Sequence, residues 1–177
     1  ALKSVSESGY FDITIKKTEQ LSGRPINNFQ VMILLSSDLG NAQVKLNQFL
    51  SFGKRIIIFP SSAIDAAGFN VSLSSIGIPS SAGLIKTEKV QAIRFSETDF
   101  IHPLFENIFM DEKKKQIESP EIYSYYKINP GAKGKSIIQL EDESSFLSEY
   151  TVSEGKILLF SASPVFSWSD FPIKGIF

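Results

Sequence analysis

The hydrophobic pattern of the first third of the chain predicts a strand, a helix and a second strand. Val31 to Leu35 form a continuous apolar run closed by polar residues, which is typical of a strand buried on both faces. Apolar residues then recur with helical spacing over positions 41–52, and Gly53 follows where a helix end favours glycine. Arg55 to Pro60 form the second apolar run. This order predicts two parallel strands joined by a right-handed helical crossover.

Weaker patterns flank this unit. Positions 64–76 predict a second helix, although Gly68 and several serines lower the helix propensity there. Positions 11–15 alternate between apolar and polar residues, as in an edge strand with one solvated face. Positions 1–8 predict a short helix before it. A doubly wound sheet needs a strand before such a helix, so we expect the chain to be a piece of a longer protein.

The pattern of the second half alternates, which predicts antiparallel strands with one wetter face. These strands are expected at 87–95, 122–128, 136–140, 146–152 and 156–162. The short Ser153-Glu154-Gly155 connection makes the last two a hairpin. A helical turn is expected at 102–109 and an exposed loop at 111–119.

We therefore expect one domain over residues 1–177, of α/β class. Its predicted form is a flavodoxin-like three-layer sandwich with a parallel core, which antiparallel strands extend in the second half. Six apolar residues of the predicted strands and helix are expected in the core: Phe49, Leu50, Ile57, Phe59, Leu158 and Phe160.

Composition excludes several kinds of site. The chain has 177 residues, 42% of them hydrophobic and none of them cysteine, so it has no disulfide, no thiolate zinc site and no cysteine nucleophile. Eighteen Lys and Arg against nineteen Asp and Glu leave no basic excess for nucleic acid. No apolar run approaches the length of a membrane span, and no signal peptide opens the chain. Any membrane attachment would come from segments absent here.

His102 is the one histidine of the chain, so a metal site built on several histidines is excluded. We expect a structural role for it at the turn before Pro103, and we predict no metal and no cofactor. Ser61 and Ser62 follow a predicted parallel strand, and a serine hydrolase using either of them with His102 is one alternative. The nucleophile-elbow pattern of such enzymes is missing.

Open α/β sheets bind ligands at the carboxyl ends of their parallel strands. The candidate binding residues there are all serines: Ser36, Ser37, Ser61, Ser62 and Ser163. Gly131 to Ser136 superficially resemble a phosphate-binding loop, but no helix follows and a β-turn is the better interpretation. Aromatic residues of the last third could form a stacking platform but are expected to pack in the core: Tyr123, Tyr125, Tyr126, Phe166, Trp168 and Phe171.

The unit from Val31 to Pro60 resembles the core of class I glutamine amidotransferase-like domains, which have a flavodoxin-like fold. In those enzymes a catalytic cysteine follows this strand, and a His-Pro pair closes a later strand. Here the first position carries Pro60 and Ser61, and the later strand ends at Ser161 to Pro164. The resemblance therefore implies the fold without the amidotransferase activity.

Nearly the whole chain resembles the carboxy-terminal region of Bacteroidetes BatA-like membrane proteins, which carry an aerotolerance-regulator N-terminal double-transmembrane segment. The matching stretches are Gly53 to Pro60, His102 to Phe109, Phe146 to Tyr150, Glu154 to Lys156 and Trp168 to Pro172. The resemblance implies a domain anchored at the cell envelope, on the periplasmic side of the cytoplasmic membrane.

Three functions follow as hypotheses. The first is a non-catalytic interaction or scaffold domain with protein partners in the cell envelope. The second is a module that binds a small ligand or a glycan at the strand ends. The third is the serine hydrolase. The sequence leaves the ligand, the partner and the oligomeric state open.

Overall fold

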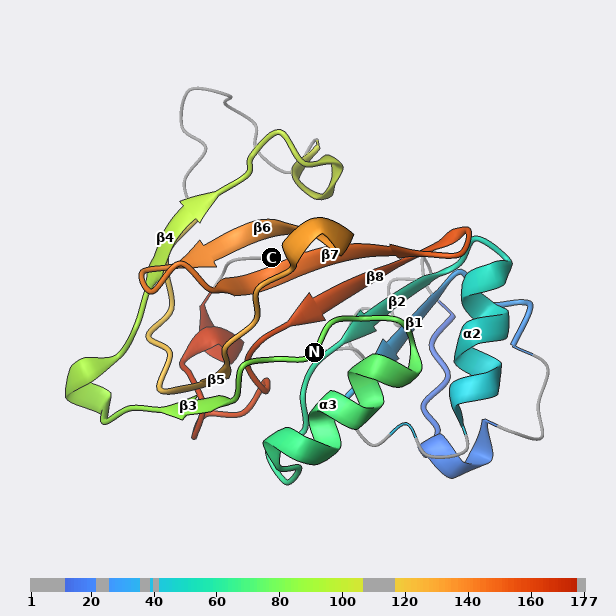
Figure 1. Ribbon diagram of the computed structural model, residues 1–177, viewed down its shortest axis with the longest axis horizontal. Coiled ribbons are helices and arrows are strands. Elements are labelled where there is room, and N and C mark those ends of the chain that lie inside the picture. Colours follow the sequence, from blue (N-terminus) through green and yellow to red (C-terminus); the bar gives the residue numbers. More distant parts are fainter. Residues whose placement is uncertain (1–11, 22–25, 36–38, 40–41, 107–116, 175–177) are drawn as a thin grey trace.

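The computed structural model describes residues 12–21, 26–35, 39, 42–106 and 117–174. Its main sheet has six strands in the order β1-β2-β8-β7-β6-β4 (Figure 1). Along the chain these are β1 (Val31–Leu34), β2 (Arg55–Ile58), β4 (Phe95–Thr98), β6 (Gly134–Leu140), β7 (Ser145–Val152) and β8 (Gly155–Phe160). β1, β2 and β8 are parallel, whereas β8, β7, β6 and β4 pair antiparallel. The predicted α/β class is confirmed.

The predicted strand, helix and strand unit is also confirmed. Helix α2 (Gln43–Ser51) connects β1 to β2, and the two strands pair in register with Val31 opposite Arg55. The apolar stripe of α2 lies against the sheet, so Leu46, Phe49 and Leu50 are fully buried. Burial of this stripe, more than intrinsic propensity, stabilises so short a helix.

The second predicted helix forms as α3 (Ala66–Ser75). Its N-cap is Asp65, whose carboxylate accepts a hydrogen bond of 2.7 Å from the amide of Gly68. Phe69 and Leu73 are buried against the core. Cap and burial together offset the low propensity of its glycine and serines.

The two faces of the sheet differ in how well they are covered. On one face Ile56, Ile58 and Leu159 are buried, whereas Ile57, Phe59 and Leu158 are only half-buried. The core prediction is confirmed, because Phe49, Leu50 and Phe160 are buried and the other three are partly buried and pack against the same core. A strand pattern in the sequence does not tell which face receives a full layer. The described residues do not establish the second helical layer of a three-layer sandwich.

Segment 122–128 does not extend the main sheet, so this prediction is wrong. Its strand β5 (Ser124–Tyr126) pairs antiparallel with β3 (Leu84–Lys86) in a separate two-stranded sheet. The amide of Tyr126 donates to the carbonyl of Ser161, just past the end of β8. The segment thus crosses the end of the sheet and pairs elsewhere.

The single strand predicted at 87–95 is also wrong. This stretch contains a 3-10 helix (Lys89–Gln91) and an isolated bridge between Ile93 and Ile122, before β4 begins at Phe95. Positions 12–15 form no strand, which corrects the expected strand at 11–15. Residue 11 and the predicted helix at 1–8 lie outside the described residues.

The final hairpin is confirmed. β7 and β8 pair antiparallel, with Leu147 opposite Phe160, and Ser153 in their connection has a positive φ of 53°. The turn expected at 102–109 is a 3-10 helix over Pro103–Phe105, and 107–109 lie outside the described residues. Of the predicted loop, residues 117–119 have no regular structure. None of the helices in the described residues is long and apolar enough to cross a membrane.

Candidate functional site

The carboxyl ends of the parallel strands are packed with aromatic rings. Phe59 after β2 stacks on Phe160 of β8, with ring centroids 4.2 Å apart and an angle of 12° between the planes. Phe160 also contacts the rings of Phe146 and Phe171. Such stacked and edge-on contacts stabilise a core beyond simple area burial. Aromatic rings therefore pack together at the carboxyl ends of β2 and β8.

The serines predicted to bind a ligand have three different environments. Ser61 is half-buried and its hydroxyl accepts a hydrogen bond of 3.2 Å from the amide of Ala63, whereas Ser62 is exposed. Ser163 is buried after β8. Ser36 and Ser37 lie outside the described residues. The predicted serine site therefore does not form one uniformly accessible surface.

His102 has a structural environment. It is the N-cap of the 3-10 helix over Pro103–Phe105, where its Nδ1 accepts a hydrogen bond of 3.1 Å from the amide of Leu104. Its Nε2 lies 3.4 Å from Oε2 of Glu149 on β7, and Oε1 of the same carboxylate lies 2.8 Å from Nζ of Lys156 on β8. An Nδ1 that accepts carries no proton, so the ring proton is assigned to Nε2. Both nitrogens are thus committed to groups other than a serine hydroxyl.

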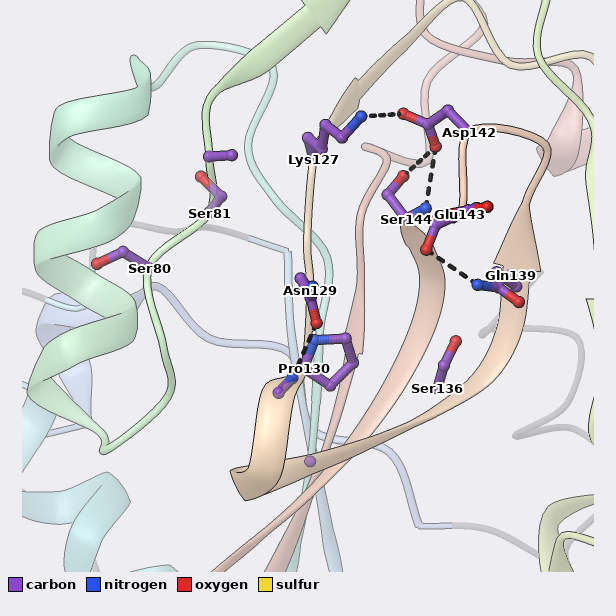
Figure 2. A pocket seen from close by; sticks show the side chains of 13 residues that line it. Ser80, Ser81, Lys127, Asn129, Pro130, Ser136, Gln139, Asp142, Glu143 and Ser144 are labelled. Carbon is purple, nitrogen blue, oxygen red and sulfur yellow. Dashed lines mark hydrogen bonds and ion pairs between the residues drawn. The ribbon is translucent and has the colours of Figure 1, made fainter.

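A polar hollow of about 700 Å³ lies between residues 80–82 before β3, residues 127–131 after β5, and β6 with the turn that leads to β7 (Figure 2). Ser80 and Ser81 lie on one side, and Gln139 and Glu143 on the other. Hydroxyl, amide and charged groups dominate its lining: Ser80, Ser81, Ala82, Lys127, Asn129, Pro130, Gly131, Gly134, Ser136, Gln139, Asp142, Glu143 and Ser144.

Asp142 organises one wall of this hollow. Its carboxylate lies 3.0 Å from Nζ of Lys127 and accepts hydrogen bonds from the hydroxyl of Tyr125 and from the amide and hydroxyl of Ser144. Burial alone would raise the pKa of Asp142, but these donors outweigh it and the pKa is lowered. Burial, then the hydrogen bond to Asp142, raise the pKa of Tyr125. This wall is a closed, ionised network.

Other groups of the hollow are available to a ligand. Neither the Glu143 carboxylate nor the Ser80 hydroxyl has a hydrogen-bond partner among the described residues. Asn129 accepts a hydrogen bond from the amide of Gly131 through Oδ1, which leaves its NH₂ group. Carboxylate, hydroxyl and amide groups of this kind suit a small, polar, hydroxyl-rich ligand. An open polar hollow differs from the enclosed apolar pockets that hold drug-like ligands tightly.

Sequence reasoning missed the hollow because its three segments are far apart along the chain. The local signals are the turn-forming residues of Pro130-Gly131 and Glu141 to Ser144. Glu143 has a positive φ of 65°, the left-handed geometry of such a turn. Nothing in either turn indicates that Ser80 and Ser81 lie opposite.

The aromatic residues of the last third form no exposed platform. Tyr125, Tyr126 and Trp168 are buried, and the Tyr126 ring contacts both Phe69 of α3 and Trp168. Phe166 alone of the set is largely exposed. The packing interpretation is confirmed for the three buried residues. Within the described part of the chain, His, Asp and Glu side chains do not gather into a group of three that could hold a metal.

No protein-family model and no curated relative matches this chain. Its fold is similar to that of cytoplasmic protein STM1381 from Salmonella typhimurium LT2, with a TM-score of 0.70 and 12% identity, over 94% of this chain and 76% of that one. Cytoplasmic protein STM3548 from Salmonella typhimurium gives a TM-score of 0.68 at 13% identity, over 93% and 76% of the chains.

A third similar structure is a beta-galactosidase from Bacillus circulans sp. alkalophilus. The TM-score is 0.52 at 10% identity, over 82% of this chain and 22% of that chain. Identities this low establish a shared fold and nothing about chemistry. The fold therefore occurs both in chains of similar length and as a part of a much larger enzyme.

Proposed function

We propose that this chain is a non-catalytic interaction domain, a relative of flavodoxin-like, glutamine amidotransferase-like domains that has lost their chemistry. The observation that carries the proposal is the stack of Phe59 on Phe160 at the ends of β2 and β8, 4.2 Å apart. It lies at the carboxyl ends of the strands, where open α/β sheets bind their substrates. The commitment of both His102 nitrogens to Leu104 and Glu149 supports the same conclusion.

An interaction domain needs a surface that favours a partner over water. The outer face of β1 offers one, because Val31, Ile33 and Leu35 are large apolar residues that remain exposed. Contiguous exposed apolar residues mark interaction sites more often than isolated ones do. We call these three residues the β1 apolar stripe.

Enzyme assays test the non-catalytic part of the proposal. Purified wild type, His102→Ala and the double variant Ser61→Ala/Ser62→Ala are incubated with panels of amides, esters and glycosides. We expect the same background rate from all three. Turnover above background that is lost in either variant would overturn the proposal in favour of the serine hydrolase.

The envelope location is a separate part of the proposal and rests on the resemblance to BatA-like proteins. The two Salmonella proteins are named cytoplasmic, but at 12 and 13% identity they share only the fold. Fractionation of cells that express the full-length protein from its own gene tests the location. Recovery in the membrane fraction is expected, and recovery only in the cytosol would contradict it.

The polar hollow favours a second function, the binding of a small polar ligand such as a neutral sugar. The observation behind it is the unpaired Glu143 carboxylate in a mostly polar lining, with Glu143 on one side of the hollow and Ser80 and Ser81 on the other (Figure 2). Calorimetric titration with a panel of neutral mono- and disaccharides tests this. A saturable signal should disappear in Glu143→Gln and persist in Glu154→Gln, whose exposed carboxylate lies outside the hollow. Absence of any signal with the wild type would rule this function out for such sugars.

A further inference from the structure

The two edges of the main sheet differ in their protection against pairing with another chain. The β4 edge carries Glu97 and is flanked by Arg94 and Asp99, and its register with β6 shifts between Phe95 and Glu97. Charges and irregular register are the devices by which natural proteins prevent edge-to-edge pairing. The β4 edge is therefore protected.

The β1 edge has none of these devices. No charged residue occurs between positions 26 and 35, no proline lies within β1, and its pairing with β2 runs in continuous register. A parallel edge strand that is regular, uncharged and apolar is the kind of edge that natural sheets avoid leaving open.

Half of the backbone groups of β1 are directed away from β2. The carbonyls of Gln30 and Leu34 accept hydrogen bonds from the amides of Arg55 and Phe59, so these positions face β2. Because backbone groups alternate along a strand, those of Val31 and Ile33 face the opposite side. Within the described residues, no strand pairs with β1 on that side.

The side chains at the same alternate positions are exposed. Val31 is 43% exposed, Ile33 41% and Leu35 60%. The continuous apolar run of β1 is typical of a strand covered on both faces. Of the residues of β1, however, only Leu34 is buried. The sequence of β1 thus matches an environment that the described residues of a single chain do not supply.

We propose that β1 pairs antiparallel with β1 of a second copy of this chain, about a two-fold axis at Ile33. This proposal rests on the proposed interaction function and names its partner. The axis places each Ile33 opposite the other and each Val31 opposite Leu35 of the second copy. Residues 26–35 carry no charge, so pairing of the β1 apolar stripe with the same stripe of a second copy brings no like charges together. The two six-stranded sheets then form one continuous sheet.

A single cysteine reports this geometry directly, because the chain contains none. In an antiparallel hydrogen-bonded pair the two Cα atoms at position 33 lie about 5.5 Å apart, within the range of about 4.4–6.8 Å that a disulfide spans. We expect the Ile33→Cys variant to form a disulfide dimer under mild oxidation at low protein concentration. The control is Val90→Cys, at a position that is 94% exposed and lies in the 3-10 helix before β4, the strand at the opposite edge of the sheet from β1, and it should stay largely monomeric.

Sedimentation equilibrium tests the association without a cross-link. Wild type should be a dimer, and Ile33→Lys should dimerise at least about tenfold more weakly because two ammonium groups would face each other across the axis. Val90→Lys should behave as wild type. Circular dichroism of both variants checks that they remain folded.

The outcomes separate this proposal from the proposed function. A wild type that stays monomeric, together with equal oxidation of the Ile33→Cys and Val90→Cys variants, overturns self-pairing. Binding of a different protein to the full-length wild type but not to Ile33→Lys would also overturn self-pairing, although it would support an interaction function. Catalytic turnover lost in the His102 or serine variants would overturn the proposed function whatever the oligomeric state.

Discussion

Leu50 and Val44 are both apolar residues of α2, but they lie on different sides of the helix. Leu50 is fully buried between α2 and the sheet, whereas Val44 is 76% exposed. Truncation of a buried leucine loses its transfer free energy and leaves a cavity that the surroundings only partly fill. The loss of stability on truncating an apolar side chain of α2 therefore depends on whether that side chain faces the sheet or the solvent.

We therefore expect Leu50→Ala to lower the free energy of unfolding by about 2–5 kcal/mol. Val44→Ala, the matched control, should change it by no more than about 0.5 kcal/mol. Urea denaturation followed by circular dichroism measures both. A loss below about 1 kcal/mol for Leu50→Ala would show that α2 packs differently.

The carboxylate of Asp142 should make the stability of the folded chain depend on pH. Its pKa is lowered in the folded chain from an ordinary value of 3.8. A lowered carboxylate pKa stabilises the fold above the unfolded value, and this contribution is lost as the pH falls through the folded value. Asp142→Asn should thus be less stable than wild type at pH 7, by about 1–3 kcal/mol.

The difference between wild type and Asp142→Asn should shrink below about pH 4, where the carboxylate first takes up a proton in the unfolded chain, and it should disappear once the folded chain is protonated as well. Denaturation midpoints measured in steps between about pH 7 and pH 3 check this. A difference that stays constant over that range would mean that Asp142 contributes through packing and not through its charge.

At the scale of elements, the hairpin of β7 and β8 approaches the end of α2 closely, and Gly155 makes this possible. A Cβ atom at position 155 would lie 2.6 Å from the carbonyl oxygen of Lys54 and 2.8 Å from the Cα of Leu50. These are backbone atoms, so a shift of the helix or of the hairpin would be needed to relieve the contact. The close contact between α2 and the hairpin therefore requires a residue without a side chain at position 155.

Gly155→Ala should lower the free energy of unfolding by about 1–3 kcal/mol or more, the usual penalty of overpacking. The neighbouring exposed position provides the control, and Glu154→Ala should have little effect. Thermal and urea unfolding measure the two variants side by side. Equal stability of both would mean that α2 and the hairpin are not in close contact at this position.

His102 joins another pair of elements, the 3-10 helix over Pro103–Phe105 and strand β7. An asparagine can replace Nδ1 as the acceptor for the Leu104 amide but cannot reach Glu149. We expect the stability order wild type, then His102→Asn, then His102→Ala, with about 0.5–2 kcal/mol between the last two. Chemical denaturation of the three proteins measures this order. Equal stability of the two variants would show that the cap contributes nothing.

At the scale of the whole molecule, the main sheet, the small sheet and both helices share one core. The Tyr126 ring of β5 contacts Phe69 of α3, and its hydroxyl donates a hydrogen bond of 2.9 Å to the carbonyl of Ile64. A single core of this kind unfolds as one unit. Association with a second copy would stabilise that unit as a whole.

If β1 pairs with a second copy, the melting temperature of the wild type should rise with protein concentration, because association favours the folded state. The melting temperature of Ile33→Lys should rise less with concentration, because its association is weaker. Differential scanning calorimetry over a wide concentration range measures both. The same concentration dependence in the two proteins would contradict pairing through β1.

The sequence by itself determined the elements whose pattern is strong and local. The buried runs of β1 and β2, the helical stripe of α2 and the short connection of the last hairpin each indicate their own structure, because period and turn chemistry are properties of neighbouring residues. The lack of cysteine and the single histidine also limit the available chemistry, and this limit follows from composition alone.

Only the tertiary structure decided which segments meet. Segment 122–128 has a strand pattern, but its partner is β3 and not the main sheet. Ser80 and Glu143 both line the polar hollow, and Phe59 stacks on Phe160 at the ends of β2 and β8. Half-burial of Ile57 and exposure of Ile33 likewise depend on what covers each face. Pairing, cavities and coverage are contacts between residues distant in sequence, and a local pattern carries no information about them.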